Sequence, residues 1–130
     1  IRACSRASRP GQDGTWISEE FINGYTELYR HGLAHSVETY SGGTLVGGLY
    51  GVSLGRAFFG ESMFYTVSHA SKAAFHALVG FAMGHNFRFI DCQVYTSHLK
   101  SLGAEMIPRE NYLALLDEAI RQPTLKGPWR

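Results

Sequence analysis

Two short apolar segments with polar side chains inside them constrain the fold of this chain most strongly. They are Phe58–Phe64 and Ile90–Gln93, and both have the length, residue types and nearby turn residues of buried strands. Glu61 lies in the first segment. Asp91 and Gln93 lie in the second, where regular strand alternation points both to one face. A buried carboxylate is unfavourable unless it is paired or hydrogen-bonded. These three residues therefore predict a polar network in the sheet, which is either a structural brace or a functional site.

The bulk composition describes one ordinary globular domain. The chain has 130 residues, of which 45% are hydrophobic and 18% are charged, so it can bury a core and does not look disordered. No apolar run is long enough to span a bilayer. The net charge of +1 gives weak support for a nucleic-acid partner, because dedicated binders carry a clear basic excess. Cys4 and Cys92 lack metal-ligand spacing and can form one disulfide, but we expect reduced thiols in a cytoplasm.

Hydrophobic periodicity and turn signals predict a mixed α/β sheet, mostly antiparallel, with helices on both faces. Ser18 and Ser68 are expected to cap helices, and Ser41–Thr44 is expected to be a hairpin turn. The tail from Pro123 is expected to be loosely held. Strands are predicted at 1–4, 35–40, 45–52, 57–64, 88–94 and 104–107, and helices at 19–31, 69–84, 97–102 and 109–121.

Glycine and histidine patterns in this chain do not favour a nucleotide cofactor or a metal. The run Gly47–Gly51 lacks the GxGxxG order of a dinucleotide loop, so its glycines are expected to allow a bulge or a close backbone approach. His31 and His35 are four residues apart, but Gly32 should end the helix between them. Cys92 is expected to point to the opposite face of the strand from Asp91 and Gln93 and to be a packed thiol.

Several motifs occur in one order along most of the chain. They cover Thr15–Ile17, Ala34–Glu38, Leu45–Val52, Gly60–Phe64, Ala70–Lys72, Ile90–Gln93, Ser101–Ala104 and Ile107–Arg109. Together they resemble the leucyl/phenylalanyl-tRNA–protein transferase family, from Gly14 to about Leu116. The resemblance implies a single catalytic domain over residues 1–130 with the acyltransferase fold known as GNAT. It also implies that the family's small N-terminal domain is missing from this chain.

The resemblance also implies a function. Enzymes of this bacterial family take Leu or Phe, and sometimes Met, from an aminoacyl-tRNA and attach it to an N-terminal Arg or Lys of a protein. The new N-terminus marks that protein for degradation by the N-end rule. We therefore expect a cytoplasmic, monomeric aminoacyltransferase whose partners are aminoacyl-tRNA and protein acceptors, with no cofactor, metal or membrane contact.

The expected site residues come from the same resemblance. Gln93, held by Asp91, is expected to act on the attacking amine, and Glu61 is expected to meet the cationic residue of the acceptor. The aminoacyl pocket is expected to be lined by Leu49, Phe58, Met63 and Ile90. Trp16 resembles the family's stacking platform for the 3′ end of the tRNA, although a Trp ahead of a helix is more often a lid over the core.

Two other function classes stay open. A coenzyme A-dependent N-acetyltransferase has the same fold, but such enzymes hold the pyrophosphate with a glycine-containing loop at a helix N-terminus. The corresponding junction, Met63–His69, contains no glycine. The other class is a non-catalytic module that binds RNA or peptide. It is distinguished by whether Asp91 and Gln93 matter for turnover at equal affinity.

Overall fold

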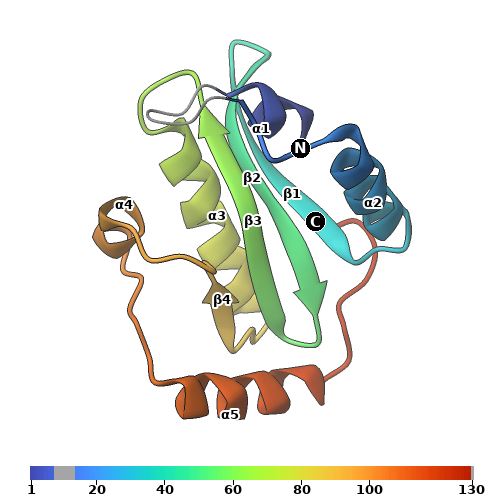
Figure 1. Ribbon diagram of the computed structural model, residues 1–130, viewed down its shortest axis with the longest axis vertical. Coiled ribbons are helices and arrows are strands. Elements are labelled where there is room, and N and C mark those ends of the chain that lie inside the picture. The colour runs from blue at the N-terminus through green and yellow to red at the C-terminus, as the bar shows by residue number, and fades with distance from the viewer. Residues whose placement is uncertain (8–13, 130) are drawn as a thin grey trace.

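A four-stranded sheet forms the centre of the molecule, and helices pack on both of its faces (Figure 1). The computed structural model describes residues 1–7 and 14–129. Strands β1 to β3 pair antiparallel in chain order, and β4 pairs parallel with β3. The predicted mixed, mostly antiparallel α/β class is therefore confirmed. The elements are α1 (Arg2–Arg6), α2 (Glu19–Arg30), β1 (Ala34–Ser41), β2 (Thr44–Leu54), β3 (Ala57–Tyr65), α3 (Ala70–Gly84), β4 (Phe89–Asp91), α4 (Ser97–Ser101) and α5 (Arg109–Ile120).

Each face of the sheet carries its own hydrophobic cluster, because neighbouring residues of β2 point to opposite sides. Tyr50 packs with Cys4 of α1 and Ile22 of α2, and we call this side the α2 face. Leu49 packs with Leu78 of α3 on the opposite side, which we call the α3 face. A strand that is buried on both faces has few charged or polar residues at alternate positions, which explains why β2 does not alternate between polar and apolar residues.

Helix α2 begins at the predicted residue and ends at Arg30, one residue before the predicted end. The Ser18 side chain caps it by accepting a hydrogen bond from the backbone N–H of Phe21 at 3.4 Å. Glu19 and Glu20 occupy the first turn, where the helix dipole favours negative charge. Gly32 has a φ of 71°, which glycine adopts without strain and which ends the helix.

Three predictions made from local sequence patterns are wrong. The structure at these positions depends on contacts with residues far away in the sequence, which a local pattern does not reveal. Residues 1–4 are not a strand: they begin helix α1, whose Cys4 is buried against the sheet. Residues 104–107 form no strand, and Met106 is 76% exposed because this segment does not reach a sheet edge. Helix α3 begins at Ala70 after His69, which takes a φ of 67°, so Ser68 is not its cap.

Two glycines of β2 lie where no side chain fits. A Cβ atom on Gly51 would collide with the backbone carbonyl of Phe59 and lie 2.6 Å from Cζ of Phe58, and one on Gly47 would lie 2.6 Å from Cβ of Ala70. Gly47 therefore lets α3 approach the sheet closely, and Gly51 leaves room for a ring that is almost completely buried. The expectation of close backbone approach in the run Gly47–Gly51 is confirmed.

We predict that Gly51→Ala lowers the free energy of unfolding by about 1–3 kcal/mol, the usual effect of overpacking a core. Gly24 supplies a matched control, because it lies within α2 and a methyl group added there would have no neighbouring atom within 4 Å. Gly24→Ala should instead raise the free energy of unfolding by about 0.5–1 kcal/mol, through better helix propensity. Urea unfolding of both variants tests this. A Gly51→Ala variant as stable as the parent would show that the backbone at Phe59 and the ring of Phe58 both move aside freely.

The C-terminal tail is held against the sheet, which corrects the expectation of a loose tail. Thr124 Oγ1 accepts a hydrogen bond from the backbone N–H of Gly55 at 2.8 Å. The guanidinium of Arg56 donates to the Pro123 carbonyl at 2.8 Å. Trp129 then packs against the hydrophobic cluster of the α3 face. No helix in the described part of the chain is long and apolar enough to cross a membrane.

Candidate functional site

The candidate site lies where β3 and β4 separate. Their parallel pairing begins at Ala57 and Phe89 and ends at Phe59 and Asp91. Beyond this point β3 continues to Tyr65, whereas the chain after Asp91 turns away toward α4 (Figure 1). Within residues 1–7 and 14–129, the edge of β3 that faces β4 therefore has no strand partner next to the predicted site residues. Such a break in a sheet, at the end of a parallel strand, is a common place for ligands.

Gln93 lies beyond the end of β4, so regular strand alternation does not place it. β4 has only three residues and ends at Asp91, and Gln93 takes a φ of 60°. The backbone N–H of Gln93 donates to Asp91 Oδ1 at 2.7 Å, and its side-chain Nε2 donates to the Gly60 carbonyl at 2.9 Å. The expected contact between Asp91 and Gln93 is therefore present, but it is made through the backbone of Gln93 and not through its carboxamide. Asp91 holds the backbone of Gln93, and Gly60 holds its carboxamide.

This arrangement leaves the carboxamide oxygen of Gln93 available. Within residues 1–7 and 14–129, Gln93 Oε1 has no hydrogen-bond partner, and the side chain is exposed. Because its Nε2 atom is fixed on Gly60, the oxygen is held at the place where the two strands separate. A carboxamide oxygen in this position can accept a hydrogen bond from an incoming amine.

Asp91 is held by a second partner that the sequence patterns did not indicate. The hydroxyl of Tyr112, from α5, donates to Asp91 Oδ2 at 2.8 Å. The Tyr112 ring packs edge-on against Phe89 with centroids 5.6 Å apart. Burial and the hydrogen bond to the carboxylate raise the pKa of Tyr112, which keeps it a donor. The only signal for it in the sequence was a hydroxyl on the apolar side of the last helix.

Glu61 occupies a β-bulge. Tyr50 on β2 lies opposite Ser62, and Gly51 lies opposite Gly60, so Glu61 has no partner residue on β2. A bulge places an extra residue in one strand and redirects its side chain, and bulges are frequent next to active sites. Glu61 is half-buried rather than buried in the core. The bulge explains why a carboxylate is tolerated inside an otherwise apolar strand.

The bulge directs Glu61 to the α2 face, where it meets the hydroxyl of Tyr25. Burial and the hydrogen bond to Glu61 together raise the pKa of Tyr25 to about 12. Tyr25 lies between two other rings: it stacks on Phe21 at 6.5 Å and packs edge-on against Tyr50 at 5.2 Å. Tyr25 is thus a second functional candidate that sequence periodicity assigned only to the apolar side of a helix.

Trp16 lies at the outer end of this aromatic row. Its ring packs edge-on against Phe21 with centroids 5.5 Å apart, and the residue is 44% exposed. A lid over the core would be more deeply buried, and the exposed ring leaves surface on which a base can stack. Its role in binding the tRNA end stays a prediction.

The four residues expected to line the aminoacyl pocket lie together on the α3 face. All belong to the cluster around Leu78, where Phe58 is 1% and Leu49 is 6% exposed. Met63 and Ile90 are half-buried, and they flank the point at which β3 and β4 separate. Phe58 and Met63 are an odd number of residues apart, so only the bulge between them brings both to one face. Their use as a pocket stays a prediction.

Of the two thiols, Cys4 is buried and Cys92 is half-buried. Within the described part of the chain, neither Cys4 nor Cys92 forms a disulfide. Burial, together with nearby Asp91, raises the pKa of Cys92, so this thiol stays protonated and is a poor nucleophile. Among the residues that the structure describes, no group of three or more His, Cys, Asp or Glu side chains is placed to hold a metal ion.

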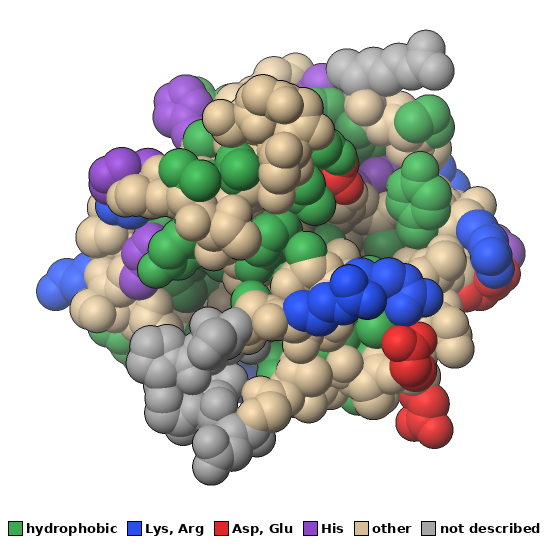
Figure 2. Space-filling view, turned by 90° about the horizontal axis from the view of Figure 1, so that it is seen from above, with side chains coloured by type: hydrophobic (Ala, Val, Ile, Leu, Met, Phe, Trp, Pro, Cys, Tyr) green, Lys and Arg blue, Asp and Glu red, His purple; other side chains and the backbone are tan. Residues whose placement is uncertain are grey.

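The face of the molecule shown in Figure 2 does not add strong electrostatic support for RNA binding. At the end of the molecule shown in Figure 2, Lys and Arg side chains lie beside Asp and Glu side chains rather than forming one continuous basic area. Arg2 and Glu19 form one such pair at 3.2 Å. This agrees with the net charge of +1.

Comparison with known proteins decides the family. Residues 1–117 match the family described as leucyl/phenylalanyl-tRNA protein transferase. The chain belongs to this family. A leucyl/phenylalanyl-tRNA–protein transferase from Syntrophus aciditrophicus is 54% identical over 129 residues, which are 99% of this chain and 54% of the relative. Transferases from Desulfatibacillum aliphaticivorans and Anaeromyxobacter dehalogenans are 54% and 52% identical, and the match covers 55% and 56% of their lengths.

The predicted membership in the transferase family is thus confirmed. The chain spans about half the length of the curated transferases it matches. Glu61, Asp91 and Gln93 fall inside the span that matches the transferase family, and so does Tyr112. Trp129 falls outside it.

Proposed function

We propose that this chain is the catalytic, GNAT-like part of a cytoplasmic enzyme that transfers Leu or Phe from aminoacyl-tRNA to an N-terminal Arg or Lys of a protein. The product would enter degradation by the N-end rule. The observation that carries the proposal is the Gln93 carboxamide, which lies on a turn held by Asp91 and is fixed on Gly60, with its oxygen free in the described part of the chain. It lies in a chain that shares 52–54% of its residues with named transferases.

The proposed reaction is the aminolysis of an ester. The nitrogen lone pair of the acceptor's α-amino group forms a bond to the ester carbonyl carbon, and the bond from that carbon to the ribose oxygen of the tRNA breaks. The nitrogen loses a proton and the leaving oxygen gains one, so no cofactor is required. An α-amino group has a pKa of about 7.7–8.0, so a useful fraction is neutral at pH 7. Positioning of the amine and the ester is then the main task, and it can lower the activation free energy by on the order of 7–11 kcal/mol.

The residues at the strand separation fit this task. Gln93 Oε1 would accept an N–H of the amine and direct its lone pair toward the ester. Asp91 would fix the turn that carries Gln93, and its charge would stabilise the positive charge that develops on nitrogen. The carboxylate of Glu61, held by the Tyr25 hydroxyl, would bind the cationic side chain of the acceptor's first residue.

The aminoacyl side chain would enter the α3 face between Met63 and Ile90. An apolar pocket of this kind distinguishes side chains that differ by one methylene only weakly, but it can exclude charged ones. The exposed ring of Trp16 would stack on the terminal base of the tRNA.

The direct test is transfer of labelled Leu from Leu-tRNA to a peptide that begins with Arg. Incorporation at the N-terminus supports the proposal, and its absence with a folded protein contradicts it. Titration with acetyl coenzyme A is the companion measurement. Binding in the micromolar range would favour the acetyltransferase instead, although the junction between β3 and α3 contains no glycine loop.

We predict that Glu61→Gln raises the KM of Arg- and Lys-starting peptides about ten-fold, because a charge-assisted hydrogen bond is lost. The KM of Ala-starting peptides should change little, so the preference for cationic acceptors narrows. Tyr25→Phe removes only the hydroxyl that holds Glu61 and should give a smaller change in the same direction. An unchanged Arg and Lys preference, with a lower melting temperature, would assign Glu61 a purely structural role.

A further inference from the structure

A third carboxylate on the sheet is held in the same way as Glu61 and Asp91, and the proposed reaction does not use it. Glu38, on β1, accepts hydrogen bonds from the hydroxyls of Ser36 at 2.9 Å and Tyr40 at 3.1 Å. The hydrogen bond from Tyr40 raises the pKa of that tyrosine. All three carboxylates therefore accept from a tyrosine hydroxyl. Within residues 1–7 and 14–129, Glu38 forms no ion pair, unlike Glu19, Glu27, Asp117 and Glu118.

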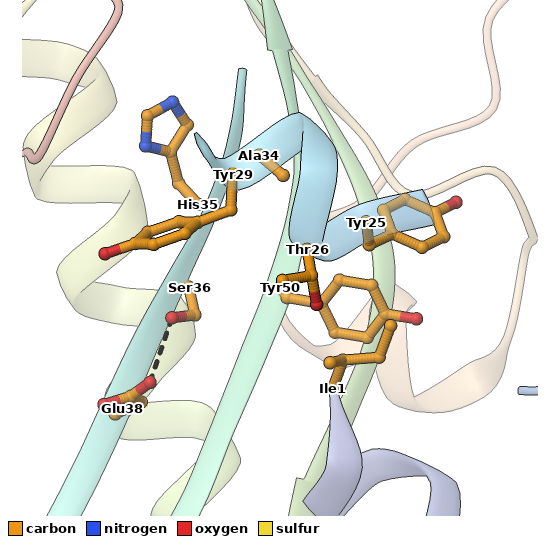
Figure 3. A pocket seen from close by; sticks show the side chains of 9 residues that line it. All are labelled: Ile1, Tyr25, Thr26, Tyr29, Ala34, His35, Ser36, Glu38 and Tyr50. Atoms are coloured by element: carbon orange, nitrogen blue, oxygen red, sulfur yellow. Dashed lines mark hydrogen bonds between the residues drawn. The ribbon is translucent and has the colours of Figure 1, made fainter. Parts of the chain in front are cut away.

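Glu38 lines a cavity of about 250 Å³ on the α2 face, between α2 and β1. Figure 3 shows Glu38 and Ser36 on β1, with tyrosine side chains of α2 and β2 beside them. The lining includes the rings of Tyr25, Tyr29 and Tyr50 and contains no Lys or Arg. His35 also borders the cavity, but its ring stacks on Trp129 of the α3 face at 3.8 Å and so points away from Glu38. Glu38 is thus the acidic side chain of a lining rich in tyrosine.

These features fit a cationic side chain. An ionised carboxylate offers about four acceptor positions, and two hydroxyls occupy only part of this capacity at Glu38. The free positions suit a guanidinium or an ammonium group, and tyrosine ring faces attract such cations as well. The two hydroxyls also fix the carboxylate before any ligand arrives, which lowers the entropy lost on binding.

We propose that this cavity binds an Arg or Lys side chain of the acceptor protein, downstream of the N-terminal residue that is modified. The proposal deepens the transferase function and rests on it for the identity of the ligand. Tyr25 connects the two sites: its hydroxyl contacts Glu61, and its ring lines the cavity of Glu38. One extended segment on the α2 face can therefore engage both carboxylates.

The strand register sets the spacing. Glu38 lies opposite Gly48 on β2, and Gly48 lies opposite Phe64 on β3, three residues beyond Glu61. Strands about 4.8 Å apart and a rise of about 3.3 Å per residue put the Cα atoms of Glu38 and Glu61 roughly 14 Å apart. An extended peptide covers about 3.3–3.6 Å per residue, so the second cation should lie roughly four residues after the first.

Binding is tested without any transfer reaction. Nα-acetyl-arginine amide has no free α-amino group, so it probes recognition of the side chain alone. In titrations followed by NMR, the resonances of Ser36, Glu38 and Tyr29 should shift in the parent protein. Glu38→Gln should weaken binding about ten-fold or more, through loss of the charge-assisted hydrogen bond. Glu20→Gln is the matched control, because Glu20 is an exposed acid on α2 that does not line the cavity.

Transfer tests the link to the acceptor. In peptides that begin with Arg and carry one further Arg moved along an alanine chain, the KM should be lowest when this second cation is near the fifth position. Glu38→Gln should abolish this dependence on position, and Tyr29→Leu should reduce it. Tyr29 is 61% exposed, so its replacement does not disturb the core. The peptide with only the first Arg is the internal reference for each variant.

The outcomes separate the two proposals. Absence of NMR shifts at Ser36, Glu38 and Tyr29, or equal shifts in Glu38→Gln, overturns the cation site whatever the activity. A KM that is independent of the second cation in the parent protein overturns its role in acceptor binding. Site-specific shifts in a protein that transfers no amino acid to any peptide would keep the cation site and contradict the transferase function.

Discussion

Replacing Asp91 by Asn is expected to lower the turnover number for Leu transfer about 10²-fold or more, comparable with the loss of one preorganised group in an active site. Asp91 uses both oxygens: Oδ1 accepts from the backbone N–H of Gln93, and Oδ2 accepts from Tyr112. An Asn side chain has only one acceptor oxygen and no charge. The variant therefore loses either the turn that carries Gln93 or the contact with α5, and it no longer stabilises positive charge on the amine.

The measurement is single-turnover transfer at saturating Leu-tRNA, with binding of a non-reactive aminoacyl-adenosine analogue measured in parallel. Binding should remain nearly intact in Asp91→Asn and in Gln93→Ala, while turnover falls in both. Tyr112→Phe is the control, because it keeps the ring on Phe89 and the charge on Asp91 and removes only one hydroxyl. Turnover at the parent level in Asp91→Asn and Gln93→Ala would leave this site without a catalytic role.

The sequence located the acids but not their partners. Asp91 and Gln93 do act as a unit, yet the predicted reason was alternation on one strand, and the structure has a turn instead. β4 stops after three residues although β3 continues to Tyr65, because the chain after Asp91 turns away toward α4. The point at which two neighbouring strands separate depends on the tertiary fold, and the residues of the strand do not reveal it.

Glu61 shows the opposite case. A carboxylate between Gly60 and Ser62, amid aromatic residues, signalled an exception to a plain strand, and the structure explains it as a bulge. Tyr25 and Tyr112 could not be found in this way. In each helix the tyrosine fits the apolar periodicity, and the partner of its hydroxyl is a carboxylate 36 or 21 positions away. Only the tertiary fold brings these pairs together.

The packing of the C-terminal tail was not predicted for the same reason. A segment with Pro123, Gly127 and Pro128 reads as irregular, and irregular segments at chain ends are usually mobile. Besides the hydrogen bonds at Thr124 and Pro123, Trp129 fixes this tail by packing. Its ring stacks on His35 at 3.8 Å and on Phe81 at 4.3 Å, with interplanar angles of 13° and 18°. A large ring held on both sides contributes far more than the composition of the segment suggests.

Replacing Trp129 by Ala is expected to lower the free energy of unfolding by about 3–5 kcal/mol, the usual effect of removing a large ring from a core. The loss should also change how stability depends on pH. Burial lowers the pKa of His35 from its ordinary value of 6.5, and its Nε2 atom has no hydrogen-bond partner in the described part of the chain. The unfolded chain then binds this proton more readily than the folded one. The contribution is fully present above pH 6.5 and is lost as the pH falls below it, toward the lowered pKa.

Urea unfolding at pH 7.5 and at pH 5.5 measures both effects. The parent protein should lose stability on acidification, and Trp129→Ala should lose less, because an uncovered His35 ring can take a proton in contact with water. Trp129→Phe is the matched variant: it keeps an aromatic ring over His35 and should retain most of the pH dependence. Equal acid-induced losses in the parent and in Trp129→Ala would mean that other groups cause the pH dependence. In that case the stack of Trp129 on His35 would stabilise the fold only by packing.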